Sequence, residues 1–385
     1  MGYIANWLND KQQAKEADWI IESTLTTLKQ RSGILDPYMP IKQYDSRNFL
    51  AYVVEQINTI ASVVAYGSNI PLTRHNAIQK LTIQMVKIAL SRVYDEPTQW
   101  DMRDSMMFAK GAAVTVQDQK MSDGSVVKGT NNDLANYLWG SIEQLVKSCM
   151  DTLNVMTWQL LQTGTVNFTD TRTETTTVIN FVDPQADYNH FPETLVQTGA
   201  NANPQDNVWS DYEYANGLQR LFLDVDTFID TNGNPPDLIV MSRRARNDLL
   251  NQKTTKEAAR QMMASTQVGT VSPDMLKNIL SARELPEIKT FDELYQIENV
   301  NKQITKGRFL NDNRYCFLVE NAGVRAVGPT LESANGALDL NPKSGVYVST
   351  REVNKEPPID CTTAIMTGVP FVGDPKKLFS RQVKA

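Results

Sequence analysis

Few residues of this chain are suited to acid–base or nucleophilic chemistry. The sequence has only two histidines, His75 and His190. A nucleophilic serine or cysteine needs an imidazole that is held in place by a second polar group. His75 lies in the polar stretch LTRHNA, which is typical of a solvated loop, and the sequence shows no nucleophile–base pair. We therefore expect no catalytic residue and no enzymatic activity.

Two acidic stretches resemble metal sites. Asp183, Asp187 and His190 fall within DPQADYNHFPE and are residue types that bind cations. The prolines that flank them favour a solvent-exposed loop, in which the ligands need not converge. The stretch 230–241 imitates the start of a calcium-binding loop, but Pro235 stands where that loop requires glycine. Because the GxxxxGK[ST], HExxH and GxGxxG motifs are also absent, the sequence predicts neither a metal nor a cofactor.

Composition narrows the function further. The 385 residues include 38 Lys and Arg against 44 Asp and Glu, and this net charge of −6 argues against tight nucleic-acid binding. The three cysteines, Cys149, Cys316 and Cys361, are too few and too widely spaced to imply a disulfide framework. No apolar run approaches the roughly 20 residues of a membrane span, and the first residues lack the apolar stretch of a secretion signal. We expect a protein made in the cytoplasm, without membrane contact.

The strongest secondary-structure signal in the sequence is one long helix. Residues 133–163 carry an apolar residue every three or four positions, with no proline to interrupt them. Asp133 fits the N-cap, and Gly164 fits the position just after the last turn. At 1.5 Å per residue the helix is on the order of 45 Å long, so it needs an extended surface to pack against. Its tryptophans, Trp139 and Trp158, are more typical of packing anchors at an oligomer surface than of ligand-stacking residues.

The segments before this helix have too little apolar surface to fold alone. Residues 11–30 predict a modest amphipathic helix, and the proline-containing segment 32–49 predicts extended chain. Residues 60–66 and 81–90 predict the two strands of a hairpin. An isolated two-stranded hairpin is only marginally stable in water, so this one needs a partner surface. After the long helix, residues 173–182 predict a further strand.

Beyond residue 208 the pattern becomes that of an α/β domain. Ser210 fits the N-cap of an amphipathic helix that ends at Asn232 and Gly233. A short buried strand follows at 238–241, and Ser242 fits the N-cap of the next helix, which runs to Leu250. The further elements predicted here are a helix from Ser272 to Ala282 and strands within 287–298, 314–327, 345–353 and 361–366.

The order of these elements resembles that of the tailed-bacteriophage major capsid protein, in its lambda E-like branch. The stretches that carry the resemblance are LDPYMPIKQYDSRNFLAYV (35–53), ASVVAYGSNIP (61–71), LQTGTVNFTD (161–170), NGNPPDLIVMS (232–242) and the tail VPFVGDPKKLFSRQV (369–383). Their order along the chain carries the likeness. The segment 110–132 is longer than the family leads us to expect and suggests an insertion.

The resemblance implies the Hong Kong 97-type capsid fold, an α+β architecture in five parts. These parts are an N-terminal arm (1–59), an extended β-hairpin loop (60–96), a peripheral domain with the spine helix 133–163 (97–207), an α/β axial domain (208–358) and a C-terminal return to the peripheral domain (359–385).

The resemblance also implies a structural function. Copies of the chain would form hexamers and pentamers that close into the icosahedral head shell around the double-stranded DNA of a phage. The partners would be further copies, with portal, scaffold and cement or decoration proteins, and the packaged DNA would be contacted non-specifically. The shell would assemble in the host cytoplasm and form the virion capsid. Permanent interfaces commonly bury about 2,000–5,000 Å² or more, which suits segments that cannot cover their own apolar faces.

Two other functions remain open. A cellular nanocompartment shell of the same fold, similar to encapsulins, would enclose a cargo enzyme instead of DNA. An α/β hydrolase or transferase would place its catalytic centre within 208–330, where the sequence has neither a nucleophile–base pair nor a phosphate loop.

Several basic residues are candidates for crosslinking or for nucleic-acid binding. Lys80 and Lys87 lie on the expected hairpin, where some members of the capsid family form Lys–Asn crosslinks. A lysine at an exposed strand edge more commonly prevents mispairing, so we expect no crosslink. Lys376, Lys377 and Arg381 are too few for a nucleic-acid patch, and a solvated or intersubunit salt-bridging face is the better interpretation.

Overall fold

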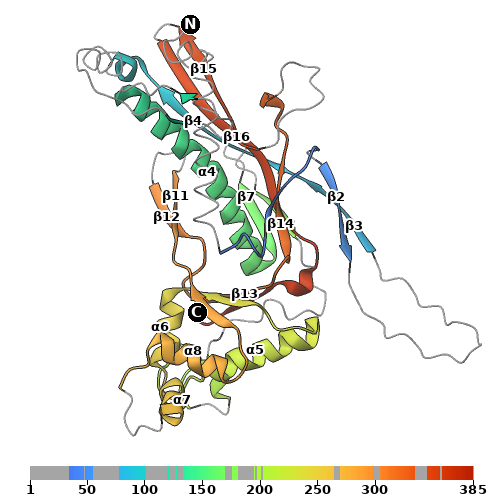
Figure 1. The fold of residues 1–385 in the computed structure, drawn as a ribbon, viewed down its shortest axis with the longest axis vertical. Coiled ribbons are helices and arrows are strands. Elements are labelled where there is room, and N and C mark those ends of the chain that lie inside the picture. Colours follow the sequence, from blue (N-terminus) through green and yellow to red (C-terminus); the bar gives the residue numbers. More distant parts are fainter. Residues whose placement is uncertain are drawn as a thin grey trace, which may run out of the picture.

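The computed structural model describes residues 34–46, 48–54, 78–100, 119–120, 126–127, 133–169, 176–180, 195, 197–200, 203–263, 269–298, 304–333, 345–355 and 358–384. Figure 1 shows a helical α/β unit at one end, a sheet with a long helix extending from it, and a hairpin that projects to the side. The helix predicted at 11–30 and the strand predicted at 60–66 lie outside the described residues. Of the expected insertion, only the short paired strands β5 (Gln119–Lys120) and β6 (Val126–Val127) are described.

A five-stranded sheet is built around one long strand, β16 (Pro358–Val372). Its neighbours are β4 (Val86–Tyr94), β15 (Tyr347–Lys355) and β14 (Gly323–Gly328), and β1 (Ile41–Gln43) adds to β14. Thr367 and Gly368 of β16 pair with β14 and with β4 at once, so these two strands lie on opposite edges of β16. Because β15 also overlaps β4 in register, β15 and β14 follow one another along the same edge.

The predicted long helix is present as α4 (Asp133–Thr163) and packs along this sheet (Figure 1). Where its side chains are described, from residue 141 on, the apolar stripe is buried as predicted, with Leu145, Cys149 and Leu153 each at most 1% exposed. These residues share one core with Ala364 and Met366 of β16. Gly164 has φ +69°, the left-handed conformation that ends a helix and that glycine adopts at least cost.

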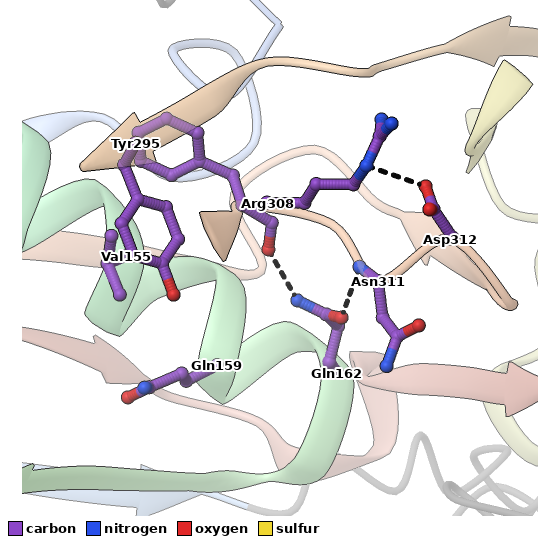
Figure 2. Close-up of a pocket in the computed structure, with 8 residues that line it drawn as sticks. Val155, Gln159, Gln162, Tyr295, Arg308, Asn311 and Asp312 are labelled. Atoms are coloured by element: carbon purple, nitrogen blue, oxygen red, sulfur yellow. Dashed lines mark hydrogen bonds and ion pairs between the residues drawn. The ribbon is translucent and has the colours of Figure 1, made fainter. Parts of the chain in front are cut away.

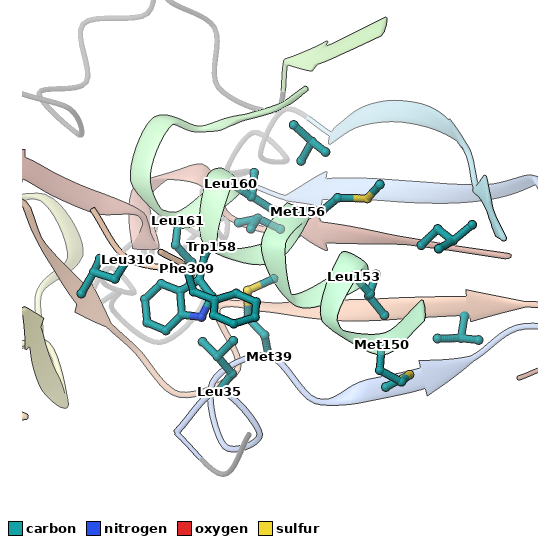
Figure 3. Close-up of a cluster of buried hydrophobic side chains, with 14 of the residues drawn as sticks. Leu35, Met39, Met150, Leu153, Met156, Trp158, Leu160, Leu161, Phe309 and Leu310 are labelled. Atoms are coloured by element: carbon teal, nitrogen blue, oxygen red, sulfur yellow. The ribbon is translucent and has the colours of Figure 1, made fainter. Parts of the chain in front are cut away.

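Figure 3 shows that the core around α4 also takes in side chains from distant parts of the chain. Leu35 and Met39, from the segment before β1, lie in the same cluster as Phe309 and Leu310. Trp158 is 1% exposed and stacks on Phe291 with 4.7 Å between ring centroids. Trp158 is therefore a packing residue as expected, but it anchors the interior of its own subunit and not an oligomer surface.

The projecting hairpin consists of β2 (Asn48–Val54) and β3 (Ile78–Gln84), paired antiparallel over seven residue pairs. β3 continues through Met85 into β4, so one extended segment leads from the hairpin into the main sheet. The strand predicted at 81–90 is thus divided between two sheets. The pairing begins at Asn48, earlier than the expected start of the extended loop at residue 60. Beside the helix, β7 (Thr165–Thr169) and β8 (Thr176–Asn180) form a second two-stranded pair.

The α/β unit has a four-stranded sheet in the order β10 (Glu287–Thr290), β9 (Leu238–Met241), β13 (Arg314–Leu318) and β17 (Phe379–Gln382). Its helices are α5 (Gly217–Asn232), α6 (Arg243–Asn251), α7 (Lys253–Met263) and α8 (Pro273–Ser281). A separate antiparallel pair, β11 (Leu294–Glu298) and β12 (Ile304–Arg308), extends from the unit alongside α4 (Figure 1). Short 3₁₀ turns occur at η1 (Pro204–Asp206), η2 (Leu331–Ser333) and η3 (Pro375–Lys377).

Alternating side chains of strand β9 join the core of the α/β unit to the core around α4. Ile239 and Met241 of β9 pack in the core formed with helices α5, α6 and α8, whereas Leu238 and Val240 pack in the core around α4. Successive residues of a strand point to opposite faces, so the small sheet is covered on both sides. The α/β unit and the spine helix therefore share a continuous interior.

The helix caps test the local predictions. Ser242 and Ser272 cap α6 and α8, each accepting a hydrogen bond from the backbone N–H three residues on. The prediction of Ser210 as the cap of the next helix was wrong, because Asn216 fills that position and accepts from the Gln219 N–H. Among the described helices, none is long and apolar enough to cross a bilayer.

Strand pairing groups three segments differently from the sequence-based boundaries. β14 and β15 fall within the range expected for the axial domain (208–358), yet both pair with β16. β17 falls within the range expected to return to the peripheral domain (359–385), yet it pairs with β13 of the α/β sheet. β14 and β17 pair with strands distant in sequence, and no local pattern encodes this pairing. β15 ends at Lys355 and β16 begins at Pro358, so the expected boundary at residue 358 divides one antiparallel pair.

Candidate assembly surfaces

The residues with potential for metal chemistry do not form a site in the described part of the chain. His75, His190, Asp183 and Asp187 lie outside the described residues. Asn232 ends α5, where its side-chain amide donates to the backbone oxygens of Phe228 at 3.1 Å and Lys376 at 3.0 Å. Among the described residues, no group of three His, Cys, Asp or Glu side chains is placed to hold a cation.

The cysteines are buried thiols. Cys149 donates to the backbone oxygen of Ala364 at 3.7 Å, and Cys316 lies 3.5 Å from the Ser380 hydroxyl. Burial raises the pKa of Cys149 to about 12 and that of Cys316 to about 11. Both side chains therefore stay protonated near neutral pH, where a thiolate nucleophile would be needed for covalent chemistry.

The segment before β1 is held by one buried cation, Arg325 of β14. The Arg325 side chain is fully buried; its guanidinium donates to the Met39 backbone oxygen at 2.8 Å, to Asn154 Oδ1 of α4 at 2.9 Å and to Asp36. Burial lowers the pKa of Arg325, and the bond to Asp36 partly offsets this. A buried charge is tolerated only when it is paired, so this contact fixes residues 36–39 against β14 and α4.

The C-terminal strand is held in a similar way by Asp224 of α5. This carboxylate is 1% exposed and accepts from Arg381 of β17 at 2.5 and 2.8 Å, from Arg220 at 2.7 and 3.0 Å and from the Tyr315 hydroxyl. Burial, together with the charge of Asp224, raises the pKa of Tyr315 well above its usual value. The expectation of a solvated or intersubunit role for Arg381 was wrong, because its partner lies inside its own subunit.

The lysines of the expected hairpin and of the tail lie in strands β3 and β4 and in the turn η3. Lys87 of β4 forms an exposed ion pair with Glu332 of η2, and the side chain of Lys80 is not described. Lys376 and Lys377 lie in η3, where Asp374 accepts from the Lys376 backbone N–H. The Lys87 pair ties η2 to the strand that leads out of the hairpin.

The β11–β12 pair leaves apolar side chains in solvent. Tyr295 lies against Gly307, where any larger residue would collide with the tyrosine ring. Leu294, Ile297 and Ile304 are 57%, 50% and 64% exposed. A two-stranded sheet with this much uncovered apolar surface is typical of a region that another molecule covers.

A pocket of about 350 Å³ lies at the base of this pair, against α4 (Figure 2). Gln162 of α4 donates to the Phe309 backbone oxygen at 2.7 Å and accepts from the Asn311 N–H at 2.9 Å. Arg308 pairs with Asp312 at 2.9 Å and with Asp292 at 3.3 Å. These bonds join the β11–β12 pair to the spine helix, and the lining residues contain no nucleophile beside a base. We therefore interpret the pocket as part of the packing between the β11–β12 pair and α4, and not as a ligand site.

Comparison with known proteins identifies the architecture. No family model matches the sequence, and no curated protein matches it. A crystal structure of a protein assigned as a prophage capsid protein, from Escherichia coli CFT073, superposes with a TM-score of 0.51 at 12% identity, covering 91% of this chain and 92% of the other. A phage-related protein from Bordetella bronchiseptica RB50 gives 0.44 at 12% identity, covering 94% and 96%. The satellite phage P4 procapsid, which includes the size-determination protein, gives 0.43 at 8% identity, covering 94% and 99%.

Of these three likenesses, the first is close enough to establish a fold. It spans nearly the whole of both chains. At this identity it establishes the fold and no more. The predicted α+β architecture is confirmed: the chain has the Hong Kong 97-type fold of tailed-bacteriophage capsid proteins.

Proposed function

We propose that this chain is a major capsid protein, which assembles with copies of itself into an icosahedral phage head shell. The observation that carries the proposal is the β2–β3 hairpin, a two-stranded sheet set apart from the body of a chain with a capsid fold (Figure 1). Such a hairpin is marginal in water, so it needs a surface that its own subunit does not supply among the described residues.

Two buried charged contacts support assembly of a rigid subunit. Arg325 fixes the segment before β1 at Asp36 and Met39, and Asp224 fixes the last strand, β17. The subunit therefore has a firm body from which the β2–β3 and β11–β12 pairs extend. Repeated contacts between such subunits close into rings when the rotation between neighbours divides a full turn.

The shell would enclose DNA and would be completed by other proteins of the phage head. The chain is net negative by six charges, so DNA would be enclosed by the shell and contacted non-specifically rather than bound tightly. Portal, scaffold and cement or decoration proteins would complete the head, and the host cytoplasm would be the site of assembly. The chain would have no enzymatic role. Its parts would act as arm, extended loop, peripheral domain, axial domain and C-terminal return, with the hairpin beginning at Asn48 and β17 belonging to the α/β sheet.

Purification of particles from cells that overexpress the chain tests this function. We expect closed shells by negative-stain electron microscopy, and nuclease-protected DNA in particles assembled during phage infection. Shells that exclude DNA and retain a bound enzyme would favour a nanocompartment instead. Turnover of a substrate by the soluble chain, lost in Asp or His variants, would favour an enzyme.

A further inference from the structure

Helix α7 of the α/β unit carries a stripe of basic side chains. Lys253, Lys256 and Arg260 recur at spacings of three and four, which places them on one face of the helix. Lys253 and Arg260 are exposed, Lys256 is partly exposed, and one acid, Glu257, lies among them. The stripe is therefore three positive charges against one negative, spread over about 10 Å of helix.

Helix α5 carries the opposite charge on its exposed face. Asp226 and Asp230 are one turn apart and both exposed, while the apolar side chains of α5 are buried in the core. None of the ion pairs formed among the described residues involves these two aspartates or the three basic residues of α7. Both surfaces thus present charged side chains that form no ion pair within the described part of the subunit.

The two surfaces lie on different flanks of the α/β unit. Figure 1 shows α5 running out to one side of the unit and α7 at the other side, below α6. One subunit therefore cannot bring its own α7 stripe onto the C-terminal half of its own α5. A second copy, rotated about an axis, presents the complementary flank.

We propose that neighbouring copies contact head-to-tail through these helices, with the α7 stripe of one subunit on Asp226 and Asp230 of the next. This inference rests on the proposed shell function and names the contact around each ring. Because the two surfaces are different and complementary, the contact is head-to-tail, and its repetition closes a ring when the rotation between neighbours divides a full turn.

The interaction energies of exposed charges suit a contact that aligns neighbouring subunits correctly. Exposed ion pairs are individually weak and are screened by salt, so they add little to subunit stability. Across an interface, complementary charge guides association and opposes wrong pairings. Tyr212, 44% exposed, lies at the start of α7, where its backbone oxygen accepts from the Lys253 N–H, and it supplies an aromatic surface beside the charges.

Charge reversal on each helix tests the contact. One variant carries Lys253→Glu and Arg260→Glu, and a second carries Asp226→Lys and Asp230→Lys. Each variant has one sign of charge on both flanks, so we expect each alone to fold, with an unchanged thermal midpoint, but to lose closed shells. The variant that combines all four substitutions restores complementarity and is expected to regain them. Lys289→Glu, at an exposed lysine of β10, is the matched control and should assemble normally.

Mixing the two single-helix variants in equal amounts gives a sharper test. Rings in which the variants alternate restore every contact, but alternation closes only rings with an even number of subunits. We expect the mixture to yield hexamers and open sheets, and no pentamers and no closed shells.

Three outcomes would overturn the proposal. Normal shells from either single-helix variant would exclude the contact. Failure of the variant with all four substitutions to regain closed shells would also exclude it. Normal shells from the α7 variant that no longer retain DNA would assign the stripe to nucleic acid. Wild-type chain assembled in parallel separates these results from a failure of the shell function itself, in which no sample would form particles.

Discussion

Arg325 and Asp36, 289 positions apart in sequence, form an ion pair that joins β14 to the N-terminal segment. The guanidinium is fully buried, whereas the carboxylate is one-third exposed. Asp36→Asn keeps the shape but removes the negative charge, leaving the buried cation with two neutral acceptors. We expect a loss of about 1.5–3 kcal/mol in the free energy of unfolding, measured by denaturant titration of unassembled protein. Asp45→Asn, at an exposed aspartate nearby, is the control and should be neutral.

Leu153 tests the buried face of the spine helix. Its side chain is fully buried and packs against β16 near Gly368. Leu153→Asp places a charge in the core, so we expect destabilisation by more than about 4 kcal/mol and no particles by electron microscopy. Thr152→Asp adds the same charge one residue earlier on the exposed face and should leave assembly intact. Normal yields of shells from the Leu153 variant would contradict the packing of this face.

Arg381 tests the closure of the α/β sheet by the last strand. Arg381→Ala leaves the buried Asp224 carboxylate with Arg220 and Tyr315 and removes its contact with β17. Breaking a buried pair commonly costs about 3–5 kcal/mol, and we expect an effect in this range by denaturant titration. Lys384→Ala, three residues further on, is the control. An equally small change in both variants would show that the strand is not held by this pair.

The buried thiols predict a loss of stability at alkaline pH. Burial raises the pKa of Cys149 from 9.0 to about 12 and that of Cys316 to about 11, so the unfolded chain releases these protons first. Their contribution to stability is complete below pH 9 and falls by about 1.4 kcal/mol per pH unit for each thiol as the pH rises above it. Replacement of both by alanine should reduce the slope of the unfolding free energy against pH between 9 and 11, leaving the part that Tyr315 contributes above pH 10. An unchanged slope would exclude the thiols as its source.

Local signals in the sequence predicted the long helix and its ends correctly. The apolar repeat of 133–163, Gly164 after it, and the caps Ser242 and Ser272 all depend on residues within a few positions. The error at Ser210 has the same scale, because Asn216 is an equally good cap and lies closer to the first turn. Helix α7 was not predicted because its sequence, KTTKEAARQMM, has a weak apolar stripe and follows α6 after a single residue.

Contacts between distant segments were beyond prediction from the sequence. Arg381 lies 157 positions from Asp224, and nothing near either residue indicates the other. The same holds for β17, whose pairing with β13 assigns the tail to the α/β sheet. The surfaces of α5 and α7 became apparent only when burial separated their exposed residues from the core.

Cryo-electron microscopy of the purified, overexpressed chain tests the central claim most directly. The capsid assignment predicts closed particles in which the β2–β3 hairpin of each subunit lies on a neighbouring copy. A homogeneous monomer in solution, with the hairpin folded against its own body and all apolar surface covered, would contradict the assignment.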